Sequence, residues 1–235
     1  MEKVVYVLWK PEGTDSDAFR DRLLGELSQE LHREGAAGLA IAVADSDVAA
    51  GEKLRLDGGL AHKDATVTFW LEQSQEVGAC ERRIEAMADR VAGYLVAESR
   101  PVVNRTHRAP LGERTPGFLL CTAITAKPGL DKAGFIELWH GEHRDVAIET
   151  QSSFAYQRNE IVRPLTPDAP GWDGIVEEFF PVEALDDQEH FYDAKGDPAK
   201  FDRHLKRMVD SCVAFLDMPK VSSHPMSQYV FEDLR

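Results

Sequence analysis

The alternation of apolar and polar positions predicts the same order of elements twice along the chain. In the first stretch, β-branched and aromatic runs with a period of two predict strands, and apolar residues three or four positions apart predict helices. The predicted strands cover residues 4–9, 38–44 and 65–71 and a short edge strand at 101–103, the predicted helices cover 15–32 and 76–97, and 45–64 is predicted to be a loop.

The second stretch repeats this order after a polar segment that contains two prolines. Its predicted strands cover residues 119–125, 154–162, 175–182 and 228–231, and its predicted helices cover 132–149 and 198–215. The order strand-helix-strand-strand-helix-strand is the ferredoxin-like pattern. We therefore predict an α+β protein with a ferredoxin-like first half at 1–104, a linker at 105–117 and a ferredoxin-like second half at 118–235. The two halves are expected to pack sheet to sheet as one pseudo-dimeric α+β barrel.

A Lys-Pro pair precedes the first helix of each half, and it sets the register between them. Lys10-Pro11 precedes Phe19, and Lys127-Pro128 precedes Phe135. When Phe19 is set on Phe135, Leu23, Leu24 and Leu27 fall on Trp139, His140 and His143. Leucine side chains transfer no protons and bind no metal. We therefore expect the first half to serve as a scaffold, and one ligand per chain to bind in a pocket bordered by residues 139–179.

Charge and cysteine content restrict the partners of this chain. A formal net charge of -14 over 235 residues argues against nucleic acids and anionic membranes, because both would repel the protein. The three cysteines are scattered and form no CxxC pair, so neither a disulfide framework nor a thiolate zinc site is predicted. The first residues become polar too early for a signal peptide, and no apolar run reaches membrane-spanning length. We therefore expect a cytoplasmic protein.

The segment Trp139-His140-Gly141-Glu142-His143 holds the strongest candidates for chemistry. Trp139 lies on the apolar face of the predicted helix, and His143 lies at the margin of that face. A histidine there can reach a cavity and titrate near neutrality as a general acid or base. The alternative is a half-buried structural histidine bonded to a backbone carbonyl. His140 and His143 are three positions apart, but a metal needs three or four ligands, so no metal is predicted.

A second group of candidates lies in the next strands. Asp173-Gly174 is a turn pair that leads into a strand in which Glu177 and Phe179 point to one side and Glu178 and Phe180 to the other. One of the two glutamates is expected to face inward, although a turn followed by a solvated edge would give the same pattern. Tyr156, Gln157 and Arg158 supply a phenol, an amide and a guanidinium that suit a carbonyl or an oxyanion, and surface hydrogen bonding explains them equally well.

At these residues the chain resembles the EthD family of the dimeric α+β barrel superfamily. The resemblance covers residues 116–231 and rests on Trp139 and His143 in a helix, Tyr156-Gln157 in a strand, and the pattern that ends in Glu177 and Phe180. It implies a barrel with an apolar cavity. Relatives of this kind include polyketide cyclases and dehydratases, decarboxylases, muconolactone isomerases and cofactor-free monooxygenases, and the wider superfamily includes haem-binding barrels.

These observations lead us to expect a cofactor-free enzyme that acts on a small, apolar, oxygenated molecule, of isomerase, cyclase/dehydratase or decarboxylase type. The predicted catalytic residues are His143 as acid or base, Asp173 or Glu177 to orient it or hold the second proton, and Tyr156 as a donor to a carbonyl. The predicted substrate-binding residues are Trp139, His140, Gln157, Trp172 and Phe179. Haem and metal are expected to be absent, although His143, His190 or His224 could bind haem iron if they faced inward. The alternatives are a non-catalytic small-ligand binding protein and a cofactor-free monooxygenase, and a homodimer is compatible with either.

Overall fold

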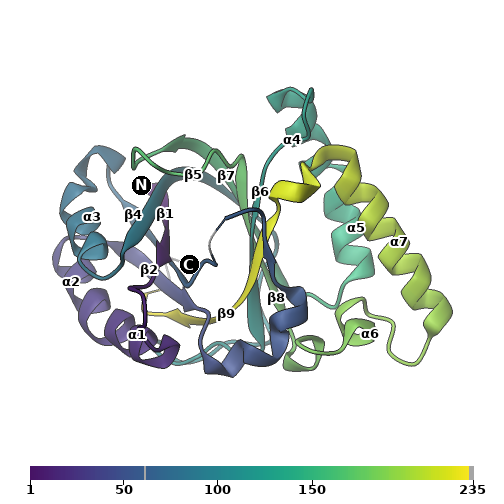
Figure 1. Ribbon diagram of the computed structural model, residues 1–235, viewed down its shortest axis with the longest axis horizontal. Helices are drawn as coiled ribbons and strands as arrows, with labels where there is room; N and C mark the ends of the chain where they lie inside the picture. The colour runs from purple at the N-terminus through teal and green to yellow at the C-terminus, as the bar shows by residue number, and fades with distance from the viewer. Residues whose placement is uncertain (61, 233–235) are drawn as a thin grey trace.

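The strands form one closed antiparallel barrel. The computed structural model describes residues 1–60 and 62–232. Within them the sheet order is β2-β4-β1-β5-β7-β8-β6-β9-β3, and β2 also pairs with β9, so the eight strands from β2 to β9 close on themselves and β3 is a short addition. The strands are β1 Glu2–Trp9, β2 Ala37–Val43, β3 Leu56–Asp57, β4 Ala65–Leu71, β5 Arg90–Val102, β6 Phe118–Ile124, β7 Ala155–Pro164, β8 Gly174–Phe180 and β9 Ser222–Val230. Figure 1 looks into this barrel.

The two halves contribute four barrel strands each, in the same order. The order is β2-β4-β1-β5 in the first half and β7-β8-β6-β9 in the second, and each corresponds to the ferredoxin-like arrangement. The halves meet edge to edge, because β5 pairs with β7 and β9 pairs with β2. Each half alone would leave two strand edges without hydrogen-bond partners, and closure satisfies them.

Helices cover the outside of the barrel on two opposite sides (Figure 1). On the first half lie α1 Ser16–Arg22, the π-helical turn η1 Leu23–Leu27, α2 Ser28–Arg33 and α3 Gly78–Glu85; on the second lie α4 Lys132–His140, α5 Glu142–Thr150, α6 Gln188–Phe191 and α7 Pro198–Phe215. The Asp15 carboxylate caps α1 by accepting from the backbone N–H groups of Asp17 and Ala18. No described helix is both long and apolar enough to span a bilayer.

The structure corrects three of the predicted elements. The predicted helix 76–97 is a short helix, α3, followed by the long strand β5, because Val91 to Val96 pair with β1 and gain a complete ladder. The predicted helix 132–149 breaks at Gly141, whose backbone leaves the helical region with φ -94 and ψ -106. The predicted loop 45–64 contains the 3-10 helix η2 Ser46–Leu54 and strand β3.

Strand alternation separates the barrel interior from the helix-covered exterior. In β8, Ile175 and Phe179 belong to the apolar cluster inside the barrel, whereas Val176 and Phe180 pack outward against helices. Glu177 therefore faces the interior and Glu178 faces the helices of the second half. This single alternation decides which of the predicted site residues can meet.

Candidate functional site

The predicted site residues lie on both faces of the second half's sheet. Trp139 and Tyr156 belong to the apolar cluster between this sheet and its helices, and His143 on α5 lines a pocket at the same place. Phe179 and Trp172 belong to the barrel interior, and Gln157 and Glu177 line a pocket at the barrel mouth. The sequence predicted one site, and the structure separates its residues into two.

The first location is a pocket between β6 and β8 and the helices α5, α6 and α7, here called the helix-side pocket. Its volume is about 280 Å³. Aromatic and aliphatic side chains form most of its wall, including Trp139, Phe191, Met208 and Phe215. The polar or ionisable side chains that reach it include His143, Gln151, Glu178, Tyr192 and Cys212. An apolar pocket with a few convergent polar groups is the usual form of a small-molecule site.

Glu178 is the ionisable group that stands out in this pocket. It faces apolar surroundings, and the resulting desolvation raises the pKa of its carboxyl from 4.5 to about 7. Its cross-strand neighbours are Leu120 on β6 and Tyr156 on β7. At neutral pH the carboxyl is therefore close to half protonated. Such a group can both accept and return a proton at little cost.

His143 borders the same pocket but stays neutral. Its Nδ1 lies 2.9 Å from the Ser211 hydroxyl on α7, and its ring packs on Phe215 at 4.8 Å between centroids. Burial, with a smaller contribution from the Arg158 charge, lowers the pKa of His143 from 6.5 to about 4. The sequence predicted titration near neutrality. The structure instead gives a neutral imidazole oriented by Ser211.

Tyr156 and Arg158 on β7 lie behind this pocket, on the same face of the sheet. Burial raises the pKa of the Tyr156 phenol, so it remains a hydrogen-bond donor. Its hydroxyl and Nη1 of Arg158 are buried and have no hydrogen-bond partner among the described residues. The Arg158 side chain is held at Nε, which donates to the Ser99 hydroxyl at 3.0 Å. Neither side chain lines the helix-side pocket itself.

Trp139 and His140 form the wall at the end of α4. A side chain at position 174 would come within 2.5 Å of the Trp139 ring, so only glycine lets the indole lie on β8. The His140 ring packs edge-on against Trp139, with 4.9 Å between centroids. Burial lowers the pKa of His140, and its Nε2 is buried without a hydrogen-bond partner in the described chain. His140 does not line the helix-side pocket.

Asp173 does not orient His143, which corrects one of the sequence predictions. Its Oδ2 accepts from the backbone N–H of Ala126 at 2.7 Å, and its own N–H donates to the Ile124 carbonyl at 2.9 Å. Asp173 therefore fixes the end of β6 against the start of β8. Its role is structural, and the partner of His143 is Ser211.

Glu177 lies at the barrel mouth, on the opposite side of the sheet from His143. There the Lys3 ammonium lies 2.5 Å from Glu98 and 3.6 Å from Glu177. The Asn159 amide donates to the Glu177 carboxylate at 2.8 Å. Burial raises the pKa of Glu98, but the charges of Lys3 and Arg100 outweigh it and hold that pKa below its usual value. Glu177 is thus part of an ion network and not a partner of His143.

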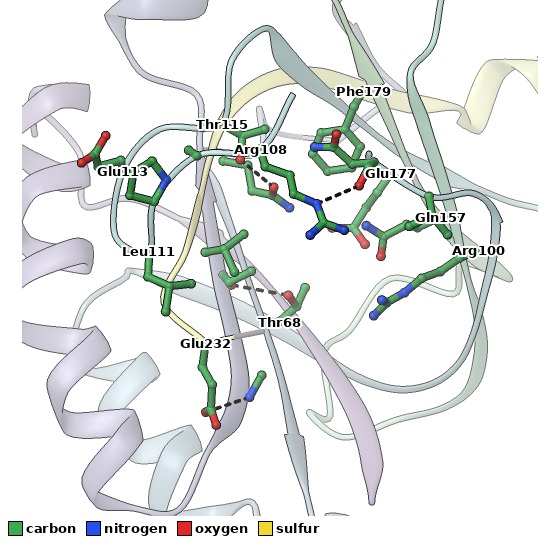
Figure 2. A pocket seen from close by; sticks show the side chains of 18 of the residues that line it. Thr68, Arg100, Arg108, Leu111, Glu113, Thr115, Gln157, Glu177, Phe179 and Glu232 are labelled. Carbon is green, nitrogen blue, oxygen red and sulfur yellow. Dashed lines mark hydrogen bonds between the residues drawn. The ribbon is translucent and has the colours of Figure 1, made fainter. Parts of the chain in front are cut away.

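The barrel-mouth pocket next to this network is small and polar. Its volume is about 120 Å³. Figure 2 shows the side chains of Arg100, Arg108, Gln157, Glu177 and Phe179 around this space. The segment after β5 passes over it and supplies Arg108, whose Nε donates to the Asn104 carbonyl at 3.3 Å. Trp172 lies deeper inside the barrel, 5.7 Å from the ring of Tyr94.

Sequence reasoning did not assign Glu178 or Ser211 to the site, for different reasons, whereas it had already offered the Arg158 guanidinium beside Tyr156 and Gln157. The two-residue alternation in β8 assigned one glutamate to each face, but it could not identify the face that carries the pocket. Ser211 lies 68 positions from His143, and no local pattern connects them.

Comparisons with known proteins agree with this architecture. The sequence model of the EthD domain matches residues 127–218, which include α4, α5, α7 and β8 around the helix-side pocket. No curated protein matches the sequence. Among solved structures, an anthrone oxidase-like protein superposes with a TM-score of 0.56 at 10% identity, covering 98% of this chain and 93% of its own.

Two further solved structures cover similar shares of both chains. A protein named "putative monooxygenase" from Lactobacillus acidophilus has a TM-score of 0.50 at 10% identity, over 99% of this chain and 97% of its own. One named "putative chlorite dismutase" has a TM-score of 0.51 at 12% identity, over 98% of this chain and 95% of its own. At these identities the similarity concerns the fold alone.

Proposed function

From the EthD domain that this chain contains at residues 127–218, we propose that the helix-side pocket is the active site of a small-molecule enzyme. The reaction is acid–base chemistry on a small, largely apolar, oxygenated compound, of isomerase, cyclase/dehydratase or decarboxylase type. One observation carries the proposal: Glu178 faces an apolar pocket, and its pKa is raised to about 7. A positioned group with such a pKa contributes roughly 10²–10⁴-fold to a rate.

The pocket residues divide the work of a proton transfer. The Glu178 carboxylate removes a proton from a carbon next to a carbonyl, and the electron pair moves to the carbonyl oxygen. The Tyr192 hydroxyl, whose pKa burial raises to about 12, donates a hydrogen bond to that oxygen. His143 acts as a neutral imidazole beside it, and Tyr156 adds a second phenol behind Glu178. The proton held by Glu178 then returns to another carbon or to a departing hydroxyl.

The two remaining alternatives differ from this reaction in the fate of the bound molecule. A monooxygenase would let molecular oxygen react with the carbanion, and the similarity in fold to an anthrone oxidase-like protein supports including this reaction. A binding protein would hold the same ligand without proton exchange. The position of Glu178 among apolar side chains favours the enzyme, because a carboxyl with a raised pKa adds nothing to the binding of an apolar ligand.

A haem group does not fit this pocket. Its volume of about 280 Å³ lies just below the roughly 300–1,000 Å³ of pockets for drug-sized ligands, and a porphyrin is larger than most of those ligands. This supports the cofactor-free form of the proposal. The purified protein is expected to show no Soret band.

Deuterium exchange tests the proposal even while the natural substrate and product are unidentified. A panel of cyclic and aromatic ketones is incubated in D₂O with the protein, and proton NMR measures the loss of the signals next to the carbonyl. Glu178→Gln should abolish enzyme-dependent exchange and keep ketone binding by calorimetry. His143→Ala should reduce exchange. Glu177→Gln, at the neighbouring position on the other face, is the matched control and should keep exchange.

Three outcomes separate the alternatives. If Glu178→Gln exchanges as fast as the wild type, the proposed role of Glu178 is wrong. Binding without exchange by the wild type would favour a ligand-binding protein. Oxygen uptake with an anthrone, lost in Glu178→Gln, would favour the monooxygenase.

The pseudo-dimeric arrangement belongs to this proposal as well. The repeated strand order supports two halves, 1–104 and 118–235, of which one keeps the active site. One ligand per chain should bind. A further homodimer remains a prediction for sedimentation analysis.

A further inference from the structure

A cluster of two histidines and one carboxylate lies at the other end of β9 from the barrel-mouth pocket. Asp57, His62 and His224 each place one ligand atom within 4.8 Å of the others. The three residues come from β3, the segment before β4, and β9. Their separation in the sequence hides the cluster from any search for short motifs.

The geometry within the cluster suits a metal ion. His224 is fully buried, and its Nε2 lies 3.0 Å from Asp57 Oδ1. Ligands of a tetrahedral zinc lie at about 2.0–2.2 Å from the metal and hence roughly 3.3 Å apart. The His62 ring stands edge-on to that of His224, with 4.4 Å between centroids. Two imidazoles and a carboxylate are donors that divalent transition metals use.

Unsatisfied ring nitrogens are a second, independent observation. Nδ1 of His62 and Nδ1 of His224 are both buried without a hydrogen-bond partner among the described residues. Leaving a buried polar group unpaired costs about 1–3 kcal/mol. A bound cation supplies a partner only to the ring nitrogen that ligates it. Because His224 faces Asp57 through Nε2, this observation concerns Nδ1 of His62, whose missing partner a cation would supply.

An acidic hollow adjoins the cluster on the side of His62. His62 lines this hollow, which has a volume of about 420 Å³. Its charged lining residues are Lys10, Asp15, Asp17, Asp45, Glu52 and Arg55. Four carboxylates against two cations raise the local concentration of metal ions.

Two basic groups near the cluster oppose the binding of a cation. Lys63 is buried next to His62, but its ammonium donates to the Ser222 carbonyl and hydroxyl at 2.5 and 2.9 Å and is held there. Arg55 lies 3.7 Å from Asp57 Oδ1, and it also pairs with Glu52 at 2.6 Å. Both cations therefore have other oxygen partners, and the Asp57 carboxylate can turn to a metal.

We propose that Asp57, His62 and His224 bind a divalent transition metal such as Zn²⁺, with a further coordination position open to the acidic hollow. Asp57 is paired with Ser222 in the β3–β9 ladder, and the adjacent pair Leu56 and Ser223 lines the helix-side pocket. A metal at Asp57 and His224 would thus fix β3 on β9 and stiffen one wall of that pocket. The site itself does not depend on the proposed acid–base function.

Zinc titration of the metal-free full-length protein tests the site. Calorimetry should give one Zn²⁺ per chain, and Zn²⁺ should raise the melting temperature. Asp57→Asn and His62→Gln should weaken binding by more than about a hundredfold, because even indirect partners of metal ligands contribute 10–100-fold. The matched control is His190→Gln, which changes another histidine–aspartate pair, His190 with Asp187 at 3.2 Å, and should bind as the wild type does.

The outcomes decide the proposal in every case. Asp57 is a surface residue with 47% of its side chain exposed, so Asp57→Asn should fold, and circular dichroism of the metal-free variant checks this. Co²⁺ in place of Zn²⁺ should give the visible bands of a nitrogen-ligated site in the wild type, which needs no variant. The proposal is wrong if the wild type takes up neither Zn²⁺ nor Co²⁺, or if Asp57→Asn and His62→Gln bind as tightly as the wild type.

Discussion

The two halves have the same strand order, but their helix-covered faces differ: one is tightly packed and the other holds a pocket. On the first half, Phe19, Leu23 and Leu27 are fully buried, and the helices close directly onto the sheet. On the second half, the helices leave the helix-side pocket. The register that sets Phe19 on Phe135 also sets Val4 on Leu120. Since Val4 pairs with Phe69 and Leu120 pairs with Glu178, Phe69 stands in the first half where Glu178 stands in the second.

A few side chains turn a scaffold face into a candidate site. Phe69 stacks on Tyr6 with 5.9 Å between centroids and fills the space that the second half leaves open. Both halves have a glycine at the equivalent place in the helix, Gly25 and Gly141. In the first half, Gly25 lies within a π-helical turn and the helix continues. In the second half, the helix breaks at Gly141. The break lets α5 carry His143 to the edge of the pocket.

The largest effect is expected from Phe69→Glu. A carboxyl would replace a fully buried ring, so the transfer and cavity terms of about 3–5 kcal/mol add to the cost of burying a charge. Urea denaturation should show a loss of about 4 kcal/mol or more in the free energy of unfolding. Glu178→Phe is the reciprocal change, and it should keep the fold while it fills the pocket. Equal stability of Phe69→Glu and the wild type would contradict the comparison.

The second test exchanges the helix residues of the two halves. Leu27→His should destabilise the protein by about 2–4 kcal/mol, because Leu27 is fully buried and an imidazole there has no partner. His143→Leu should cost less than about 1 kcal/mol, since it loses one hydrogen bond and gains apolar contact. Thermal unfolding compares the two. If Leu27→His and His143→Leu lose the same amount of stability, the two helix-covered faces do not differ in packing as described.

The sequence predicted the order of strands and helices, and it placed the chemistry in the second half. It failed where local spacing and long-range pairing disagree. Val91 and Leu95 have helical spacing with Ile84, yet they pair with β1 as part of β5, because only the closed barrel gives those residues a partner. Closure is a long-range property that no local pattern encodes.

The candidate site was predicted only in part, because it too depends on long-range contacts. Trp139, His143 and Tyr156 do lie on one face, and Glu177 and Phe179 lie on the other. Alternation in β8 was recognised, but the choice between Glu177 and Glu178 needed the position of α5. The cluster of Asp57, His62 and His224 could not be predicted, because His224 is 167 positions from Asp57 and the ladder of β3 and β9 brings these two together.

A third test uses pH to separate the two faces. Because the pKa of Glu178 is raised from 4.5 to about 7, the folded state holds a proton that the unfolded state has released. Its contribution to stability is full below about pH 4.5 and is lost as pH rises through about 7. Glu178→Gln removes this dependence. Relative to the wild type, the variant should gain on the order of 2 kcal/mol between about pH 5 and pH 9.

Urea denaturation at several pH values measures that difference. Glu81, which accepts from the Tyr6 hydroxyl at 2.8 Å on the first half, provides the control as Glu81→Gln. A pH-independent difference between Glu178→Gln and the wild type would show that the carboxyl titrates normally.

The smallest effect is expected from Ser211→Ala. The variant loses the contact of 2.9 Å to His143 Nδ1, which contributes about 1 kcal/mol. Deuterium exchange should slow several-fold, because the imidazole is less well oriented. Ser211→Thr keeps the hydroxyl and should restore the rate. Equal exchange rates for the wild type, Ser211→Ala and Ser211→Thr would contradict a role for the oriented His143 imidazole in the reaction.

The two seams of the barrel, where the strands of one half pair with those of the other, affect which substitutions the chain can tolerate. β5 with β7, and β9 with β2, are joined through backbone amides and carbonyls. Such contacts depend on the path of the main chain and tolerate most of the side chains that it carries. Each half can therefore accumulate its own substitutions without losing its companion, as separate subunits with a side-chain interface could not. The permanent attachment of a half whose helices close directly onto its sheet leaves the other half free to change its chemistry.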